Sequence, residues 1–299
     1  MRHLIIGGGG FVGQHLIRAL SATGDEVTVI DRSPAPATEQ HVPWSVHDFS
    51  AGPFPKPVPA ADVVHCLVGT YRGGDADMLA ANVHALHHSL SSLVSAPGLV
   101  LYVGAGSIYG ERAERVTEDH PPAPTTMYGL TKWLSESVLM YHAARVGFPY
   151  VVLRPTNIYG PGNRKNVFWA FYDALQKHGL VTVFGDGTQA RDFAYVGDVV
   201  DLIVRVVEPS GRAAVANQVF NVAGAESHTV LDVLRAMSTA LGREIPVRYA
   251  PSEGGVLAHF GMSTAKAKRL VGWRPRKRFE DGVRETLASY GVGLATATS

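Results

Sequence analysis

The stretch HLIIGGGGFVG, residues 3–13, is the first indication of the fold. The apolar run HLII predicts a short buried strand, and the apolar spacing from Phe11 to Thr23 predicts a helix directly after it. Glycine suits the turn between them because the chain must bend tightly and a pyrophosphate can then reach the free N–H groups of the helix. The spacing of Gly7, Gly10 and Gly13 therefore indicates a dinucleotide-binding turn, with a flexible strand–helix turn as the alternative.

The same alternation of strand and helix continues through the first half of the chain. Helices are expected over 78–94 and 126–146, and apolar strands at 26–30, 42–46, 62–68, 99–103 and 150–154. Buried strands that alternate with helices predict an α/β fold, a doubly wound parallel sheet (Rossmann fold) covered on both faces. The proline-rich segment 52–60 is interpreted as a surface loop that replaces a helix.

Beyond Gly160 the pattern loosens and predicts a smaller C-terminal α/β substrate lobe. Its elements include strands at 180–184 and 218–222 and helices over 167–177, 199–207, 229–241 and 280–290. We expect a dinucleotide-binding domain made of 1–161 and about 190–222. The substrate-binding lobe is then made of about 162–189 and 223–299.

Composition excludes several classes of protein. With 27 Lys and Arg against 26 Asp and Glu, the formal net charge is +1, which leaves no basic surface for nucleic acid. One cysteine, Cys66, cannot form an internal disulfide. No apolar run approaches the roughly 20 residues that span a bilayer, and the chain begins almost directly with a strand rather than a signal peptide. We expect a cytoplasmic protein with no membrane or nucleic-acid partner.

Metal binding is not predicted. The chain has 13 histidines, of which His84 and His88 share one face of a predicted helix. Without further ligands at metal-binding spacing, these are interpreted as helix-surface histidines.

Asp31 ends the second predicted strand, where an acidic residue accepts hydrogen bonds from the adenine ribose hydroxyls and repels a 2′-phosphate. This position favours NAD. The neighbouring Arg32 could hold a phosphate instead, so NADP is the alternative cofactor. A turn residue before SPAP is the other interpretation of Asp31.

Tyr128 and Lys132 are four residues apart on a predicted helix and therefore share one face. A free tyrosine has a pKa of about 10, and a lysine cation together with a positively charged nicotinamide ring would favour its phenolate. Such a pair suits acid–base catalysis beside a hydride acceptor.

These motifs resemble, in one order, the extended short-chain dehydrogenase/reductases. The glycine turn, Asp31 and the Tyr128–Lys132 pair are followed by LRPTNIYGPG at 153–162, GDGTQARDFAYVGDVV at 185–200 and LVGWRPRKRFEDGV at 270–283. More narrowly, the chain is similar to the NAD-dependent epimerase/dehydratase branch, whose members modify nucleotide sugars. The resemblance covers nearly the whole chain.

The resemblance implies a set of cofactor-binding residues. Besides the glycines, Asp31 and Arg32, these are Phe11 and Val12 at the pyrophosphate, Asp48 and Phe49 at the adenine, Leu67, Val68 and Gly69 under the cofactor, Asn82 as a brace, Lys132 at the nicotinamide ribose and Pro155 beside the nicotinamide. It also implies substrate diphosphate contacts from Asn157 and Arg191. For Arg191, a surface salt bridge with Asp192 is the alternative.

The chain departs from the family pattern after the strand at 99–103. Ala105 stands where the family has a substrate-binding Ser or Thr, and Gly106 and Ser107 replace the Asp–Glu pair of the sugar 4,6-dehydratases. Because elimination needs an acid and a base on the sugar, dehydration is not expected. Ser107 or Thr126 could supply the second hydrogen bond to the substrate. The alternative for Ser107 is a turn hydroxyl bonded to its own backbone.

A second departure lies near the end of the chain. No arginine stands between Arg248 and Arg269, where the family often has a further diphosphate-binding arginine. Either Arg164 or Lys165 replaces it, or the substrate is not a standard nucleotide sugar.

The sequence thus predicts an NAD-dependent epimerase of a nucleotide sugar that works through a transient keto intermediate, with Tyr128 and Lys132, assisted by Ser107, as its catalytic residues. The first alternative is a keto-sugar reductase of the same family that uses NAD(P)H. A cofactor-binding protein without catalysis is the second. The resemblance implies a homodimer in which the helices at 78–94 and 126–146 pair with their copies; from the sequence alone they could equally be internal.

Overall fold

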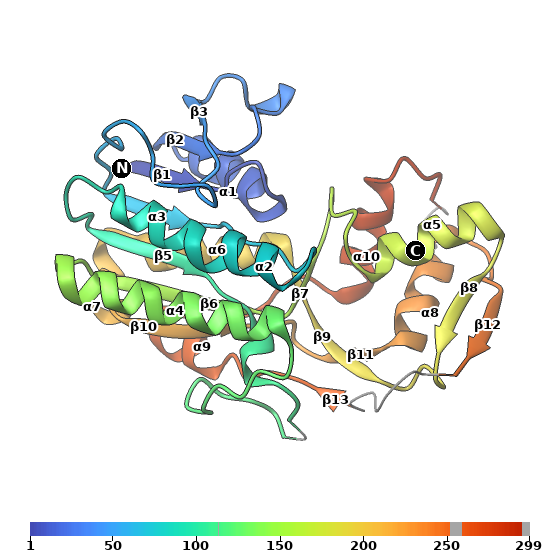
Figure 1. Ribbon diagram of the computed structural model, residues 1–299. Helices are drawn as coiled ribbons and strands as arrows, with labels where there is room; N and C mark the ends of the chain where they lie inside the picture. Colours follow the sequence, from blue (N-terminus) through green and yellow to red (C-terminus); the bar gives the residue numbers. More distant parts are fainter. Residues whose placement is uncertain (113, 252–258, 295–299) are drawn as a thin grey trace.

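Seven parallel strands form the central sheet of the computed structural model, which describes residues 1–112, 114–251 and 259–294 (Figure 1). Their spatial order is β10–β6–β5–β4–β1–β2–β3. The bounds are β1 (Arg2–Ile6), β2 (Glu26–Asp31), β3 (Trp44–Val46), β4 (Val63–Cys66), β5 (Leu99–Val103), β6 (Tyr150–Pro155) and β10 (Gln218–Val222). The order reverses between β1 and β4, so the carboxyl ends of these two strands define the ligand-binding crevice of a doubly wound sheet.

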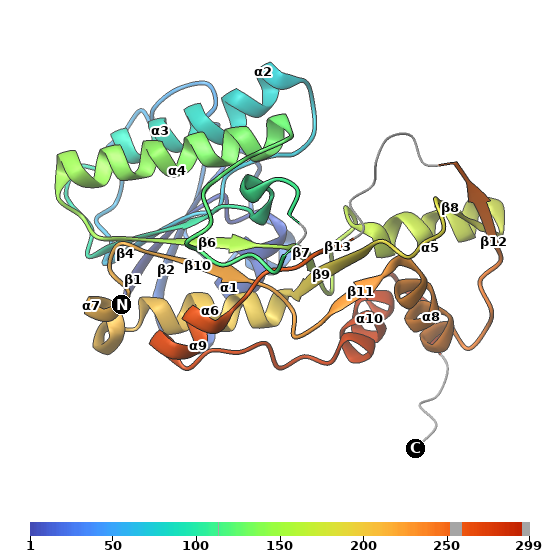
Figure 2. The ribbon, with the colours of Figure 1, turned by 90° about the horizontal axis from the view of Figure 1, so that it is seen from below.

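Helices cover both faces of this sheet, as Figure 2 shows. On one face lie α1 (Phe11–Ala22), α6 (Val196–Val207), the short α7 (Arg212–Val215) and α9 (Ala265–Val271). On the other lie α2 (Asp75–Met78), α3 (Ala85–Ser91) and α4 (Met127–Val146). A π-helical turn over Leu79–His84 joins α2 to α3, so the helix predicted over 78–94 is an interrupted one.

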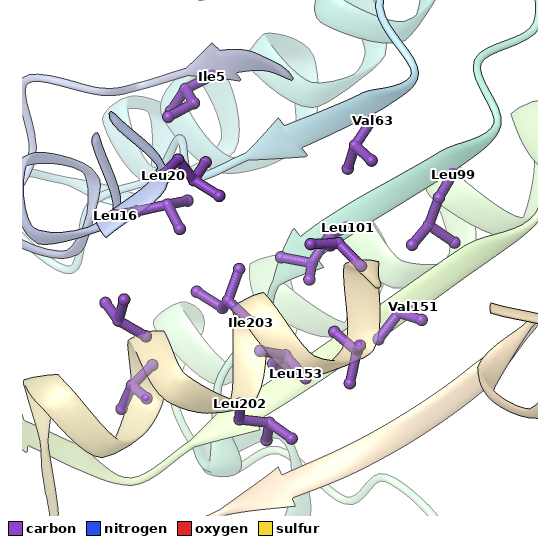
Figure 3. Close-up of a cluster of buried hydrophobic side chains, with 14 of the residues drawn as sticks. Ile5, Leu16, Leu20, Val63, Leu99, Leu101, Val151, Leu153, Leu202 and Ile203 are labelled. Atoms are coloured by element: carbon purple, nitrogen blue, oxygen red, sulfur yellow. The ribbon is translucent and has the colours of Figure 1, made fainter. Parts of the chain in front are cut away.

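Alternate residues of each strand enter two different cores. Ile5, Leu101 and Leu153 face the layer of α1 and α6, where Leu16 and Ile203 meet them (Figure 3). Their strand neighbours, including Leu4, Ile6, Val100 and Val152, pack against α3 and α4 on the opposite side. Burial on both faces explains why these strands are continuously apolar.

A second lobe contains α5 (Val167–His178), α8 (Val230–Leu241) and α10 (Phe279–Ala288) around an aromatic core (Figure 1). Strands β8 (Val181–Phe184) and β12 (Val247–Ala250) pair in parallel at its edge. Between the two lobes, β9 (Ala190–Tyr195) pairs with β7 (Asn157–Tyr159), β11 (Ser227–Thr229) and β13 (His259–Phe260). The smaller lobe is therefore attached through a sheet that shares no strand with the central one.

The predicted fold class is confirmed, and the proline-rich segment 52–60 is a loop. The short strands β7, β9, β11 and β13 were not predicted. The domain boundaries stay a prediction, although β9, which falls in the predicted dinucleotide-binding part, pairs outside the seven-stranded sheet. Across the described ranges, no helix has the length and apolar character needed to cross a membrane.

A buried ion pair ties α4 to the sheet. Arg154 on β6 donates from Nε and Nη2 to the two carboxylate oxygens of Glu136 on α4, at 3.1 and 2.7 Å. Its Nη1 donates to the Tyr109 hydroxyl at 2.7 Å, and that hydroxyl donates to Asn221 Oδ1 on β10 at 2.8 Å. The guanidinium, the carboxylate and the phenol hydroxyl of this network each have hydrogen-bond partners, as a charge buried in a protein core requires.

Arg154→Met is expected to lower the free energy of unfolding by about 3–5 kcal/mol, because it leaves the Glu136 carboxylate buried without its partner. The measurement is urea unfolding followed by circular dichroism. Arg205→Met, which removes a partly exposed pair with Asp201 on α6, is the control and should cost less than about 1 kcal/mol. Equal losses for both variants would contradict the structural role of the buried pair.

Candidate active site

The predicted site residues gather at the carboxyl edge of the central sheet. The β1–α1 turn, Asp31 at the end of β2, the loop after β4, the turn after β5 and Pro155 at the end of β6 all lie on this edge. A parallel sheet brings these strand ends together although they are far apart in sequence.

The glycine turn approaches its neighbours too closely for side chains. Gly7 has φ +88°, and a Cβ there would lie 3.0 Å from the carbonyl carbon of Leu67. A Cβ on Gly13 would lie 2.5 Å from Gly8 O, inside the contact distance of any real side chain. Gly10 is the N-cap of α1 and offers no side-chain cap, so the first N–H groups of that helix face the turn. This bare cradle fits a pyrophosphate.

Asp31 is bound to the glycine turn directly. Its Oδ2 accepts a hydrogen bond from Gly9 N and its Oδ1 one from Ser33 N, both at 2.8 Å. Gly9, which the sequence pattern did not single out, thus fixes the carboxylate beside the turn. Arg32 is exposed.

The residues assigned to the adenine end have different environments. Phe11 and Val12 are half-buried in the first turn of α1, and Asp48 is exposed with Oδ1 accepting from Ser50 N. The Phe49 side chain lies in the core, so only its backbone is available to an adenine.

Asn82 braces the loop after β4. Its Oδ1 accepts from Thr70 N at 2.7 Å, and its Nδ2 donates to Thr70 O and to Thr131 Oγ1 on α4. A Cβ on Gly69 would lie 2.6 Å from Asn82 Oδ1 and 3.2 Å from Lys132 Nζ. Leu67 and Val68, half-buried, connect this loop to Gly7. The loop, Asn82 and Lys132 therefore form one unit.

Tyr128 and Lys132 occupy the first turns of α4, which begins where Thr126 Oγ1 accepts from Gly129 N. Burial lowers the pKa of the Lys132 ammonium to about 8, against the opposing effect of the Glu136 charge. Burial also raises the pKa of the Tyr128 phenol to about 12, and Tyr71 adds to the rise. The protein's own groups thus keep Tyr128 protonated, opposite to the lowering that the pair alone predicts.

The Thr126 hydroxyl oxygen caps α4, and the same exposed hydroxyl can still donate a hydrogen bond to a ligand.

Ser107 has a different environment. Its Oγ is buried, and within the described part of the chain it has no hydrogen-bond partner. The alternative of a hydroxyl bonded to its own turn is therefore not observed. A buried hydroxyl without a partner costs about 1–3 kcal/mol, which fits a group that bonds a ligand.

The turn after β5 has no space for a dehydratase pair. Ala105 is buried, and a Cβ on Gly106 would lie 2.7 Å from Met262 Sδ. Met262 is itself fully buried, so an acidic side chain at position 106 would displace a core residue.

The two residues assigned to the diphosphate lie on neighbouring strands. Asn157 on β7 donates from Nδ2 to Asp192 O on β9 at 3.0 Å, and Arg191 on β9 is half-buried with Nη1 bonded to Ala190 O. The Asp192 carboxylate accepts from Met262 N and Ser227 Oγ instead. Arg115 Nη2 also lies 3.9 Å from Asp192 Oδ2. Successive strand residues such as Arg191 and Asp192 point to opposite faces of a sheet.

Tyr71 is a residue of this site that the sequence pattern did not identify. Its ring meets Tyr128 edge to face, 6.1 Å between centroids, and its hydroxyl donates to Lys165 O at 2.6 Å. Arg164 is exposed and stacks on Trp169 at 4.8 Å. The sequence signal for Tyr71 is its position just after the strand predicted at 62–68. The predicted gap between Arg248 and Arg269 includes residues 252–258, which lie outside the described ranges.

The ring of His84, which ends the π-helical turn, lies 6.4 Å from that of His88 on α3, and His87 Nδ1 on α3 lies 3.1 Å from Nε2 of the buried His142 on α4. Among residues 1–112, 114–251 and 259–294, no three His, Cys, Asp or Glu side chains are placed to hold a metal ion.

The model of the NAD dependent epimerase/dehydratase family matches residues 3–223. An uncharacterized UDP-glucose epimerase of Bacillus subtilis is 29% identical over 204 residues, which cover 67% of this chain but only 61% of that relative's length. A dTDP-4-dehydro-6-deoxy-D-allose reductase of a Streptomyces species is 26% identical over 96% of this chain and 95% of its own.

A solved structure matches over the full length. It is the UDP-glucuronic acid 4-epimerase of Bacillus cereus in complex with UDP-glucuronic acid and NAD. The similarity covers 97% of this chain and 99% of that one, with a TM-score of 0.85 and 25% identity.

Lys132→Met is expected to be more stable than the wild type at pH 7, because Lys132 holds a charge in a dry site. The pKa of Lys132 is about 8 in the folded chain, below its value of 10.5 in the unfolded chain. Between pH 8 and pH 10.5 the unfolded chain therefore binds more protons than the folded chain, and the free energy of unfolding of the wild type rises with pH. The advantage of the variant should shrink by about 3 kcal/mol across this window.

The measurement is urea unfolding of both proteins at several pH values. Lys177→Met, which removes an exposed lysine on α5, should keep the wild-type pH dependence. A constant difference between Lys132→Met and the wild type from pH 7 to pH 10.5 would show that the lysine is not buried as a charge.

Proposed function

Since the chain belongs to the NAD dependent epimerase/dehydratase family, we propose that it is an NAD-dependent epimerase of a nucleotide sugar acting through a keto intermediate. The observation that carries the proposal is the placement of Tyr128 and Lys132 on one face of α4, with Lys132 Nζ at the loop after β4 that lies against the glycine turn. A general acid–base pair next to a dinucleotide cradle suits redox chemistry at a sugar carbon.

The residues present fit NAD. The turn from Gly7 to Gly13 would hold the pyrophosphate, Asp31 the adenine ribose, and Lys132 the nicotinamide ribose above the loop that Asn82 braces. A carboxylate at the position of Asp31 disfavours a 2′-phosphate, so NAD is preferred to NADP. When bound, NAD supplies the oxidant for the sugar hydroxyl and the reductant for the resulting ketone.

Tyr128 exchanges the proton of the reacting sugar hydroxyl. Because burial keeps its pKa near 12, Tyr128 would act as a base only when positive charge lowers that pKa, and the Lys132 ammonium together with the positive charge of a bound nicotinamide would do so. Ser107 Oγ donates a hydrogen bond to the same sugar oxygen and replaces the hydroxyl missing at Ala105. Asn157 and Arg191 hold the diphosphate, and Thr126 offers a further hydroxyl.

A keto-sugar reductase is the second candidate. The similarity to the Streptomyces reductase over nearly the whole length favours it. The same Tyr128 would then donate a proton to a ketone in a net reduction. The two activities differ in cofactor balance, because the epimerase regenerates its NAD and the reductase consumes NAD(P)H.

We infer a homodimer formed through α4, in the cytoplasm. Trp133, Met140 and Tyr141 are 38, 38 and 57% exposed and follow each other at the spacing of one helix face. Large apolar side chains gathered on one exposed face are typical of a contact between subunits. The single cysteine, Cys66, is buried and free, which is consistent with a reducing compartment.

Incubation with UDP-glucose, UDP-glucuronic acid and dTDP- and GDP-linked sugars, each with NAD, tests the activity. We expect proton NMR to detect the 4-epimer of at least one sugar while absorbance at 340 nm stays constant. Tyr128→Phe should reduce turnover by about 10²–10⁴-fold. Tyr249→Phe, at an exposed position of β12, should retain it. Stoichiometric consumption of NADH with a keto-sugar would instead assign the reductase, and unchanged turnover in Tyr128→Phe would overturn the mechanism.

The double variant Met140→Glu, Tyr141→Glu is expected to be monomeric, because two buried carboxylates at a subunit contact are costly. Sedimentation velocity measures the change against a dimeric wild type. Phe184→Glu, which places a charge on the exposed edge of the smaller lobe, should remain dimeric. A monomeric wild type, or a dimeric double variant, argues against this interface.

A further inference from the structure

Tyr102 is a fully buried tyrosine near the carboxyl end of β5, in the core between the sheet and α4. Burial holds the pKa of its phenol well above the ordinary value, so the side chain is a neutral ring at every physiological pH. Its ring lies directly at the Lys132 ammonium, with Nζ 4.7 Å from the ring centroid.

The surroundings of Lys132 provide little other support for its charge. The residue is 4% exposed, and Nζ donates to a single carbonyl, Val103 O, at 2.8 Å. The nearest acid on its own helix, Glu136, uses both carboxylate oxygens for Arg154.

Other charged or titratable groups near this pair are accounted for. Tyr128 on α4 is held protonated by burial, and the thiol of Cys66 on β4, which faces Tyr102, is likewise neutral because burial raises its pKa to about 12. The Arg154 guanidinium on β6 is paired with Glu136. The ring face of Tyr102 therefore lies against the ammonium together with Val103 O, while the charge of Glu136 also favours the protonated lysine.

We propose that Tyr102 is a positioning residue whose ring face holds the Lys132 ammonium at the carboxyl edge of the sheet, between Val103 O and the loop of Gly69. Aromatic faces attract cations within about 6 Å of their centroid, and the attraction grows when the cation is desolvated. Tyr102 acts through Lys132 and touches neither substrate nor cofactor. The functional part of this inference rests on the proposed role of Lys132 at the nicotinamide ribose.

The geometry makes a distinction that can be tested. If the ring face matters, replacing the hydroxyl should change little, whereas removing the electron density of the face should weaken the hold on the ammonium. Cation–aromatic attractions favour the ammonium. Loss of such an attraction is expected to lower the Lys132 pKa by about half a unit to one and a half units.

The experiment compares the wild type with Phe, pentafluorophenylalanine and Leu at position 102. Pentafluorophenylalanine keeps nearly the shape of the ring but withdraws electron density from its face, so the test does not depend on the folding of the Leu variant. Competitive acetylation with trace acetic anhydride from pH 7 to pH 11, read by mass spectrometry of the Lys132 peptide, gives the pKa of Lys132. The exposed Lys177 in the same sample is the internal reference.

We expect Tyr102→Phe to match the wild type and the fluorinated and Leu variants to show a lower Lys132 pKa. The same pKa in all four proteins would overturn the proposal. So would a drop in Tyr102→Phe as large as that in the fluorinated variant, because the hydroxyl rather than the ring would then be responsible.

The labelling needs no sugar and no turnover, so it separates this inference from the proposed function. If the pKa pattern holds while no nucleotide sugar is converted, the positioning role stands and the epimerase assignment fails. If epimerase activity is found and the Lys132 pKa is insensitive to the ring, the activity stands and the role of Tyr102 fails.

Discussion

The paired charges of Arg154 and Glu136 are the interaction on which the arrangement of the candidate site depends. The guanidinium joins β6 to α4 and, through the Tyr109 hydroxyl, to the turn after β5 and to β10. The helix that carries Tyr128 and Lys132 and the turn that carries Ser107 are thus fixed to the sheet by one buried network. Directional bonds of this kind set a register that apolar packing alone leaves adjustable by small shifts.

Several groups near this network are in environments that lower the stability of the fold and that a purely structural core would not contain. Lys132 keeps an ammonium in a nearly dry position, and Ser107 buries a hydroxyl for which the described residues offer no partner. The β1–α1 turn gives up side chains at Gly7 and Gly13 so that backbone can approach backbone. These costs coincide at the carboxyl edge of the sheet, and coincidence of unfavourable groups in one place is typical of a functional site.

The local sequence pattern was sufficient to predict those helices and strands whose own residues show a clear periodicity. The seven strands of the sheet and the helices α1, α4, α5, α6 and α8 follow from apolar periodicity, and the cofactor turn and Asp31 follow from residue type at a strand end. The strands β7, β11 and β13 lack such a signal because they are short, and the longer β9 lacks it because its residues are mixed in polarity; all four pair only within their own sheet. The sequence also gives no signal for the π-helical turn that interrupts the helix before α3, although Asn82 lies in this turn.

The sequence by itself determined the family, now confirmed over residues 3–223, the doubly wound fold and the Tyr128–Lys132 pair, because each depends on residues close together in the chain. Only the tertiary structure decided that Ser107 lacks a partner, that Met262 fills the space at Gly106 and that the Phe49 ring belongs to the core. It also placed Tyr102 under Lys132 and Tyr71 beside Tyr128. These facts depend on contacts between different strands, loops and helices, and the spacing of residues along one element carries no information about them.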